Sequence, residues 1–204
     1  MKLIYVFLFI LVLTIIHLYI QNNNQKLINE QLQEISEDLI SEKISLTVHK
    51  INREYELLFN GRELSDKLAL LDDKNQAVLL KDIVEKKKLI FRYSELHCNT
   101  CIDTEISNLK QLADSIGNEN IIVFVTPVNQ KYIIQFKKLN NIKFAIYKLS
   151  EDMEAQIPDI GLPYYFVLES DNFRLNASFV PQKEISELTN RYFNDIRSKY
   201  FIKE

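Results

Sequence analysis

The 204-residue sequence contains only two cysteines, three glycines and four prolines, and it has no tryptophan. The two cysteines lie three positions apart, so a disulfide between them would close a very small loop and could not staple a domain of this size. The charge is nearly balanced, with a net value of −3 and an isoelectric point near 5.7. This balance provides no basic surface, so we expect no nucleic-acid partner.

A long apolar run is present at the N-terminus, where residues 3–20 read LIYVFLFILVLTIIHLYI. A helix of this length rises about 27 Å, close to the roughly 30 Å hydrocarbon core of a bilayer. No pair of small residues marks a cleavage site before Gln21, and Tyr19 suits a membrane interface. We therefore predict an uncleaved transmembrane anchor in residues 1–21, with a cleaved signal peptide as the alternative.

The charges that flank this run indicate its orientation. Lys2 and the amino terminus precede it, whereas Lys26 is the first cation after it and several acidic residues follow. The positive-inside rule therefore points to an N-terminus in the cytoplasm. The rest of the chain would then lie on the outer, periplasmic side of the cytoplasmic membrane.

Residues 22–60 form a polar segment with apolar side chains at helical spacing. Four of them step by four, three and four residues: Ile28, Leu32, Ile35 and Leu39. This spacing predicts a helical stalk that ends at Asn60-Gly61, because glycine often follows a helix end. The apolar stripe either packs back on the globular domain or forms a short coiled coil that makes a homodimer above the membrane.

After residue 61, short apolar runs alternate with segments of helical spacing. The predicted strands are 67–71, 77–80, 88–94, 121–125, 143–148, 164–169 and 177–180, and the predicted helices are 102–116, 130–139 and 183–202. Strand–helix–strand–helix–strand order, followed by a hairpin and a helix, predicts an α/β domain over residues 61–204. Its mixed sheet would be flanked by helices on both faces.

Cys98 and Cys101 follow the predicted strand 88–94 and stand at the start of the next helix. Helix N-terminal N–H groups and the helix dipole stabilise a thiolate, so we expect Cys98 to have a lowered pKa and to act as the nucleophile. Cys101, one turn further on, can then attack a mixed disulfide as the resolving thiol. Two buried structural thiols are the alternative reading of the pair.

A metal site is the other use of two cysteines at this spacing. Structural zinc normally takes four ligands, and beyond the pair the chain offers only His17, His49 and His97. His17 lies in the predicted anchor and His49 in the predicted stalk. We therefore predict no metal site, and nothing in the sequence calls for another cofactor.

A second signal lies late in the chain, where Pro163 stands at the start of a predicted strand in the sequence GLPYYFVL. The stretches AVLLKDIVEKKKLIFRYSELHCNTC, IIVFVTP and GLPYYFVLESDNF together resemble the thioredoxin superfamily, in particular the membrane-anchored TlpA/ResA-like thiol-disulfide oxidoreductases. The likeness covers roughly residues 65–200. It implies a thioredoxin-like fold that exchanges disulfides with protein partners, as a reductant fed by a membrane electron donor.

The resemblance also implies roles for residues near the two motifs. Pro163 would be a cis-proline that faces the cysteine pair, and Leu162 would offer backbone polar groups to an extended partner segment. TlpA-like proteins often place a glutamate where this chain has Thr104, and Glu105 is next to it. The proton acceptor for Cys101 is therefore left open, with Glu105 as the carboxylate next to that position.

Two further positions depart from the family pattern. His97 replaces the usual aromatic residue before Cys98, and it either adds positive charge near the thiolate or merely covers the site. Arg92 stands six residues before Cys98, where thioredoxins have a buried aspartate. It either pairs with Glu95 or helps to hold Cys98 as a thiolate.

These observations predict a membrane-anchored, extracytoplasmic thiol-disulfide oxidoreductase that acts on protein disulfides through its CxxC pair. The alternative is a redox-inert thioredoxin-fold binding or sensor module presented on the stalk. Copper delivery is a weaker third reading, because a third ligand would have to come from His97.

Overall fold

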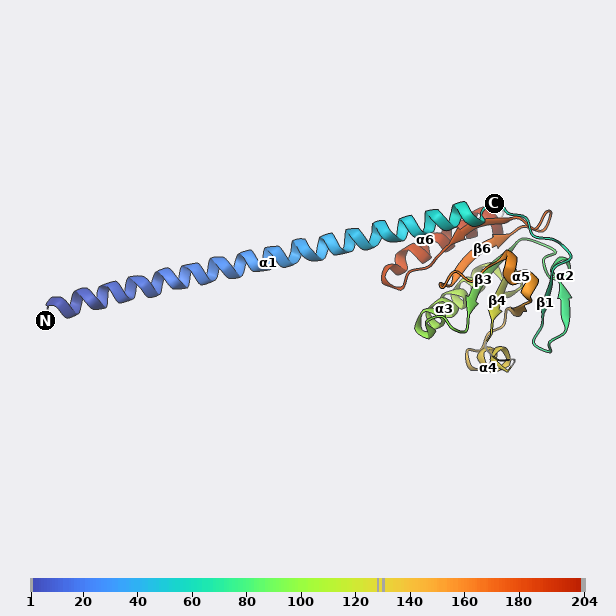
Figure 1. Ribbon diagram of the computed structural model, residues 1–204, viewed down its shortest axis with the longest axis horizontal. Coiled ribbons are helices and arrows are strands. Elements are labelled where there is room, and N and C mark those ends of the chain that lie inside the picture. Colours follow the sequence, from blue (N-terminus) through green and yellow to red (C-terminus); the bar gives the residue numbers. More distant parts are fainter. Residues whose placement is uncertain (1, 128, 130, 203–204) are drawn as a thin grey trace. The chain divides into compact units, whose positions relative to one another are not determined.

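The computed structural model describes the backbone of residues 2–127, 129 and 131–202, and the side chains of the same residues except 2–8 and 184. The chain divides into two compact units, Met1–Thr47 and Val48–Glu204. The described residues of the first unit, 2–47, are all helical. They form the larger part of α1 (Lys2–Phe59), and the last turns of that helix belong to the second unit (Figure 1).

The end of α1 is tied into the second unit by its own side chains. Phe59 is fully buried, and Asn52 bonds to both backbone groups of Val180, with its amide donating to the carbonyl and its oxygen accepting from the N–H. Gly61 follows with φ +87°, a left-handed conformation that glycine adopts without strain. The helix therefore continues into the packed unit, and the predicted division of the chain at residues 21/22 and 60/61 stays a prediction.

The predicted anchor lies at the start of α1, and the side chains of residues 3–8 are outside the described part. In that described part, no helix has the combination of length and apolar character that a membrane crossing requires.

The second unit is built around one sheet of seven strands. The strands are β1 (Ala69–Leu71), β2 (Ala77–Leu79), β3 (Lys88–Ser94), β4 (Ile121–Thr126), β5 (Ala145–Leu149), β6 (Tyr164–Leu168) and β7 (Leu175–Phe179). Their order is β2-β1-β5-β4-β3-β6-β7, with β3, β4 and β5 mutually parallel and the remaining neighbours antiparallel. β3 and β4 are buried along almost their whole length, as expected of central strands covered on both faces.

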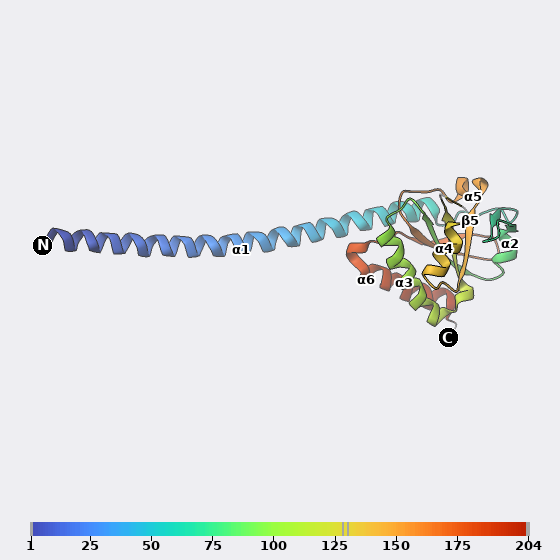
Figure 2. The same cartoon turned by 90° about the horizontal axis from the view of Figure 1, so that it is seen from below.

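Helices cover both faces of this sheet. They are α2 (Leu80–Ile83), α3 (Asn99–Ile116), α4 (Tyr132–Leu139), α5 (Glu151–Gln156) and α6 (Ser186–Ile196). One core holds residues of α3, α4 and α6, and the other holds residues of α2, α5 and the end of α1 (Figure 2). The mixed sheet flanked by helices, predicted from the order of apolar runs, is confirmed.

The helices of the structure differ from the predicted ones at several places. The predicted final helix 183–202 is broken into a 3₁₀ turn, α6 and a π-helical turn at Arg197–Phe201. Helix α5 was not predicted, because it buries only Met153 and is too short to show a helical period. The predicted helix 130–139 starts at Gln130, which lies outside the described residues, and α4 begins at Tyr132.

Candidate active site

The cysteine pair lies where the central strand β3 passes into α3. A short turn follows Ser94, and Cys98 is the residue that immediately precedes the first helical residue, Asn99. Cys98 is exposed and Cys101 is half-buried, and both side chains are in the thiol form. The structure therefore presents a reduced pair at a helix N-terminus, with the first sulfur open to a partner.

The surroundings of Cys98 favour its ionised form. A hydrogen bond with the Cys101 thiol lowers the pKa of Cys98 most, and the backbone N–H groups of Cys101 and Thr100 lower it further. The positive charge of Lys183 acts in the same direction. Cys98 therefore carries more thiolate near neutral pH than an ordinary cysteine does, which is the form that attacks disulfides.

Glu105 lies one helical turn after Cys101, so both side chains are on the same side of α3. Burial raises the pKa of the Glu105 carboxyl above its ordinary value, against hydrogen bonds from Tyr165 and Asn108 that lower it. The Tyr165 hydroxyl donates to Glu105 Oε2 at 2.7 Å. A carboxylate with a raised pKa is a better proton acceptor, so Glu105 has the property that the sequence alone left open.

Cys101 and Glu105 open on the same cleft, which has a volume of about 200 Å³. Thr104 of the same helix also lines the cleft, and the other walls come from chain segments far away in sequence: Leu162, Pro163, Pro181, Gln182 and Lys183. Pro163 is buried, whereas Leu162 keeps 37% of its surface exposed. The two motifs that carried the resemblance are thus brought together beside Cys101.

The Leu162–Pro163 peptide bond is trans, so the expectation of a cis-proline was wrong. The chain bends at Gly161 and Leu162, immediately before this bond. Gly161 takes a left-handed conformation with φ +77°, and its N–H donates to Asp159 Oδ1 at 2.8 Å. The turn into β6 therefore depends on a glycine and an aspartate.

His97 is turned away from the sulfur of its neighbour. Its Nε2 lies 2.8 Å from Asp159 Oδ1, and its Nδ1 accepts the Ser94 N–H at 3.2 Å. Both ring nitrogens are thus used by groups other than Cys98, and the side chain is only 5% exposed. This arrangement fits the second interpretation offered by the sequence, in which His97 covers the site.

Arg92 has no exposed surface, and its ion pair is with Asp159, at 3.5 Å between Nη1 and Oδ2. Its Nη2 donates to Thr126 Oγ1 at 3.1 Å. Arg92 is therefore paired with Asp159, a residue to which the sequence analysis gave no role. Partial burial raises the pKa of Asp159, but Gly161, His97 and Arg92 together hold this pKa below its ordinary value.

Sequence reasoning missed three residues of this site: Asp159, Tyr165 and Lys183. Asp159 precedes a glycine by two positions, a typical turn signal that does not reveal a role at Cys98. Tyr165 has the pattern of a core residue, and Lys183 that of a solvated helix start. No group of three or more metal-ligating side chains is assembled within the described part of the chain.

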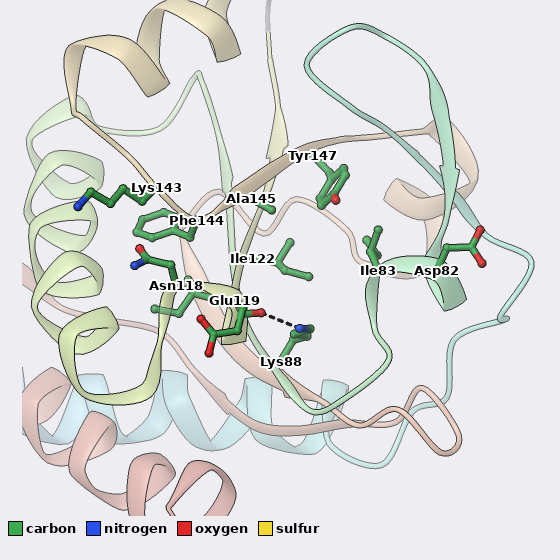
Figure 3. Close-up of a pocket in the computed structure, with 11 residues that line it drawn as sticks. Asp82, Ile83, Lys88, Asn118, Glu119, Ile122, Lys143, Phe144, Ala145 and Tyr147 are labelled. Carbon is green, nitrogen blue, oxygen red and sulfur yellow. Dashed lines mark hydrogen bonds between the residues drawn. The ribbon is translucent and has the colours of Figure 1, made fainter.

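A separate hollow of about 490 Å³ lies at the opposite end of the strands, near the starts of β3 and β4 (Figure 3). There Lys88 Nζ donates to the Glu119 carbonyl at 2.6 Å, and burial lowers the pKa of Lys88. Among the described residues that line it there is no cysteine or histidine. This hollow shares no lining residue with the cleft beside Cys101.

No protein-family model matches the chain, and no curated protein sequence matches it. Several solved structures are similar to it. A thiol:disulfide interchange protein from Bacteroides sp. aligns with a TM-score of 0.51 at 14% identity, over 66% of this chain and 90% of that one. A candidate thiol:disulfide interchange protein DsbE from Chlorobium tepidum aligns with a TM-score of 0.52 at 12% identity, over 68% and 98% of the two chains.

A candidate protein disulfide isomerase from Bacteroides thetaiotaomicron is similar to the same degree, with a TM-score of 0.51 at 12% identity over 68% of this chain and 91% of that one. Identities this low establish the fold and not the activity. The second unit therefore has the thioredoxin-like fold that the sequence resemblance implied, and the prediction of that fold is confirmed.

Proposed function

We propose that this chain is a thiol-disulfide oxidoreductase that exchanges disulfides with partner proteins through Cys98 and Cys101. The observation that carries the proposal is the exposed Cys98 at the start of α3, with its lowered pKa and with Cys101 beside it. The thioredoxin-like fold supports it, because solved proteins of that fold include thiol:disulfide interchange proteins. A fold alone would not carry this conclusion.

In the proposed reaction the Cys98 thiolate attacks one sulfur of a disulfide in the partner protein. A mixed disulfide forms, and the other sulfur of the partner leaves as a thiolate that takes up a proton. Cys101 then loses its proton and attacks the Cys98 sulfur, which releases the second partner thiol. The partner is reduced by two electrons and the chain is oxidised to the Cys98–Cys101 disulfide.

Glu105 is the proposed proton acceptor for Cys101. It lies one turn further along α3, it lines the same cleft, and its raised pKa makes its carboxylate a stronger base than an exposed glutamate. TlpA-like proteins often have a glutamate at the position of Thr104. In this chain the next residue, Glu105, would accept the proton instead. The hydrogen bond from Tyr165 keeps the carboxylate in place.

Leu162 and Pro163 form the proposed contact for the partner backbone. They precede β6 and face the cleft beside Cys101, so an extended segment could add to the chain there as a strand does. The trans peptide bond does not remove the carbonyl and N–H groups of Leu162. The oxidised chain would return to the dithiol by taking two electrons from a membrane donor.

The proposal includes an N-terminal anchor that keeps the second unit on the outer side of the cytoplasmic membrane. It rests on the apolar sequence of residues 3–20 and on the charge distribution around it. The large apolar side chains described there are exposed within their own unit, from Phe9 to Ile20. Fractionation of cells with an antibody to the second unit, followed by protease treatment of intact spheroplasts, tests both the anchor and the orientation.

We also propose that the stalk pairs with a second copy of this chain. Ile28, Leu32, Ile35 and Leu39 are each more than half exposed and lie on one face of α1. In a parallel coiled coil, Asp38 would stand beside this seam and face Lys43 of the second copy, a favourable charge pair. The acidic residues of the stalk, such as Glu34 and Glu37, disfavour the alternative of contact with an anionic membrane surface.

The central experiment is a redox titration of the full chain in graded thiol–disulfide buffers, with the two thiols counted by mass spectrometry after alkylation. A reversible two-electron transition that is lost in both Cys98→Ser and Cys101→Ser supports the oxidoreductase, and its midpoint decides between reductant and oxidant. Failure to form the Cys98–Cys101 disulfide in any oxidising buffer would leave the redox-inert binding module.

A further inference from the structure

One carboxylate links the two loops that make the candidate active site. Asp159 Oδ1 accepts the Gly161 N–H at 2.8 Å, and the same oxygen lies 2.8 Å from His97 Nε2. Gly161 starts the turn that presents Leu162, and His97 is the residue before Cys98. The loop of the nucleophile and the loop of the proposed partner contact are 62 residues apart in sequence and meet at this side chain.

His97 is held in one orientation by this contact. Its Nδ1 accepts the Ser94 N–H, and because a backbone N–H can only donate, Nδ1 carries no proton in this arrangement. The proton is then on Nε2, which donates to the Asp159 carboxylate. The ring is thereby fixed at both ends, and the backbone that enters Cys98 is fixed with it.

The Asp159 carboxylate is also held by Arg92, a buried residue of β3. The fully buried guanidinium pairs with Asp159 Oδ2 and donates to Thr126, whose hydroxyl donates in turn to Glu154 Oε1 at 2.5 Å. The Nε and Nη1 atoms of Arg92 have no hydrogen-bond partner among the described residues. A buried cation with few partners depends strongly on its counter-charge, so Asp159 is kept at this place.

We propose that Asp159 is a positioning residue that sets the distance between Cys98 and the Leu162–Pro163 backbone, and so decides how well a protein disulfide is presented to the thiolate. This inference rests on the proposed oxidoreductase function. Asp159 does not touch the reacting sulfur atoms. It acts through His97 on one loop and through Gly161 on the other.

The consequence is a difference between large and small substrates. A protein disulfide must contact Leu162 and Pro163 while its sulfur meets Cys98, so a shift of one loop against the other lowers its rate steeply. A small aromatic disulfide needs only the exposed thiolate. A loss of charge stabilisation at Cys98 would slow both reactions alike, whereas a loss of loop position slows only the first.

The test uses the full chain with insulin as the protein disulfide and a small aromatic disulfide as the reference. In Asp159→Ala we expect the second-order rate constant with insulin to fall by roughly tenfold or more, and that with the small disulfide to change by less than about threefold. Asp114→Ala, an exposed site on α3, is the matched control and should match the wild type with both. Equal losses with both substrates, or no loss, would overturn the inference.

The same substitution of Asp159, made in a chain that lacks the Arg92 guanidinium, distinguishes a positioning role of Asp159 from neutralisation of a buried charge. Arg92→Leu removes the guanidinium and leaves the Asp159 contacts to His97 and Gly161 intact. If Asp159 served only to neutralise Arg92, the Arg92→Leu/Asp159→Ala chain would react with insulin as fast as Arg92→Leu alone. We expect the double variant to be slower by the same roughly tenfold factor.

Failure of the proposed function has a different outcome. A wild-type chain that reduces neither disulfide would contradict the oxidoreductase, and the inference would then be decided by hydrogen exchange at the Gly161 amide. Exchange there should accelerate at least tenfold in Asp159→Ala and stay unchanged in Asp114→Ala. An unchanged Gly161 rate in Asp159→Ala would overturn the positioning role in that case too.

Discussion

The hydroxyl of Tyr165 donates a 2.7 Å hydrogen bond to Oε2 of Glu105, a buried contact between β6 and α3. Burial raises the pKa of Tyr165 well above its ordinary value, so its hydroxyl stays protonated and remains a donor. The same burial raises the pKa of Glu105. A buried carboxyl group is thus kept in the cleft that Cys101 lines, at some cost to stability.

Replacement of Glu105 by glutamine should slow the resolving step. Without a carboxylate beside Cys101, attack on the mixed disulfide should slow by roughly tenfold or more, since a positioned base commonly contributes at least that much. The measurement is the lifetime of the mixed disulfide, trapped with acid and followed by mass spectrometry. Glu119→Gln, exposed at the far end of the strands, is the control and should keep the wild-type lifetime.

The same variant should change how stability depends on pH. Because the pKa of Glu105 is raised in the fold, the folded chain keeps this proton to a higher pH than the unfolded chain. The stability linked to Glu105 is therefore full below its unfolded pKa, near 4.3, and is lost as the pH rises through its folded pKa. Thermal unfolding should show the stability of Glu105→Gln rising relative to the wild type as the pH increases above about 4.3, and a constant difference would contradict this.

The thiol of Cys101 should control the ionisation of Cys98. The hydrogen bond with Cys101 is the largest cause of the lowered pKa, so Cys101→Ala should raise the midpoint of Cys98 alkylation with iodoacetamide. Cys101→Ser keeps a donor at the same place and should leave the midpoint lower than in the alanine variant. Equal midpoints in the two variants would show that a hydrogen bond from the side chain at position 101 does not stabilise the thiolate.

Lys183 should add a salt-sensitive part to the same effect. Lys183→Glu replaces an attractive charge near Cys98 by a repulsive one, so the alkylation rate near neutral pH should fall. The loss should shrink in about 1 M salt, where the Debye length is roughly 3 Å. Lys138→Glu carries the same charge change on α4 and serves as the control; a loss of equal size in both variants would exclude a local role for Lys183.

The packing of α3 on the sheet should dominate the stability of the second unit. Leu109 has no exposed surface in the core shared by α3 and the sheet, so Leu109→Ala should cost about 2–5 kcal/mol by loss of burial and by the cavity it leaves. Leu139→Ala, at a side chain that is 84% exposed, should change stability by less than about 0.5 kcal/mol. Urea unfolding of the two variants measures the difference, and similar midpoints would contradict this account of the core.

The stalk should lose its partner when its seam is made polar. Leu32→Asn with Leu39→Asn places two amides in the proposed interface, so the full chain should shift to a lower mass in light scattering. Leu27→Asn is exposed on the same helix but lies outside the seam, and should leave the mass unchanged. Charge reversal at Asp38 should weaken pairing, and Lys43→Glu added to Asp38→Lys should restore it. A monomeric wild-type chain would end the proposal.

The sequence was sufficient for features that adjacent residues encode. Strand β3 was predicted with its observed bounds, because a short run rich in apolar and aromatic side chains (Leu89, Ile90, Phe91 and Tyr93) ends at a turn. The cysteine pair at the start of α3 followed from that strand and from the apolar period of the helix behind it. These features depend on neighbours along the chain. The prediction of a mixed sheet with helices on both faces likewise rested on the order of segments along the chain.

Tertiary structure alone decided which groups meet around those cysteines. The contact of Asp159 with His97 joins residues 62 positions apart, and Lys183 reaches the cleft from a still more distant segment. The conformation at Pro163 also differed from the expectation, because Gly161 and Asp159 make the turn. Local pattern reports whether a residue is apolar, charged or a turn former. Which charges pair, and which carboxylate is buried under a thiol, depends on how the sheet brings distant loops to one edge and excludes water from them.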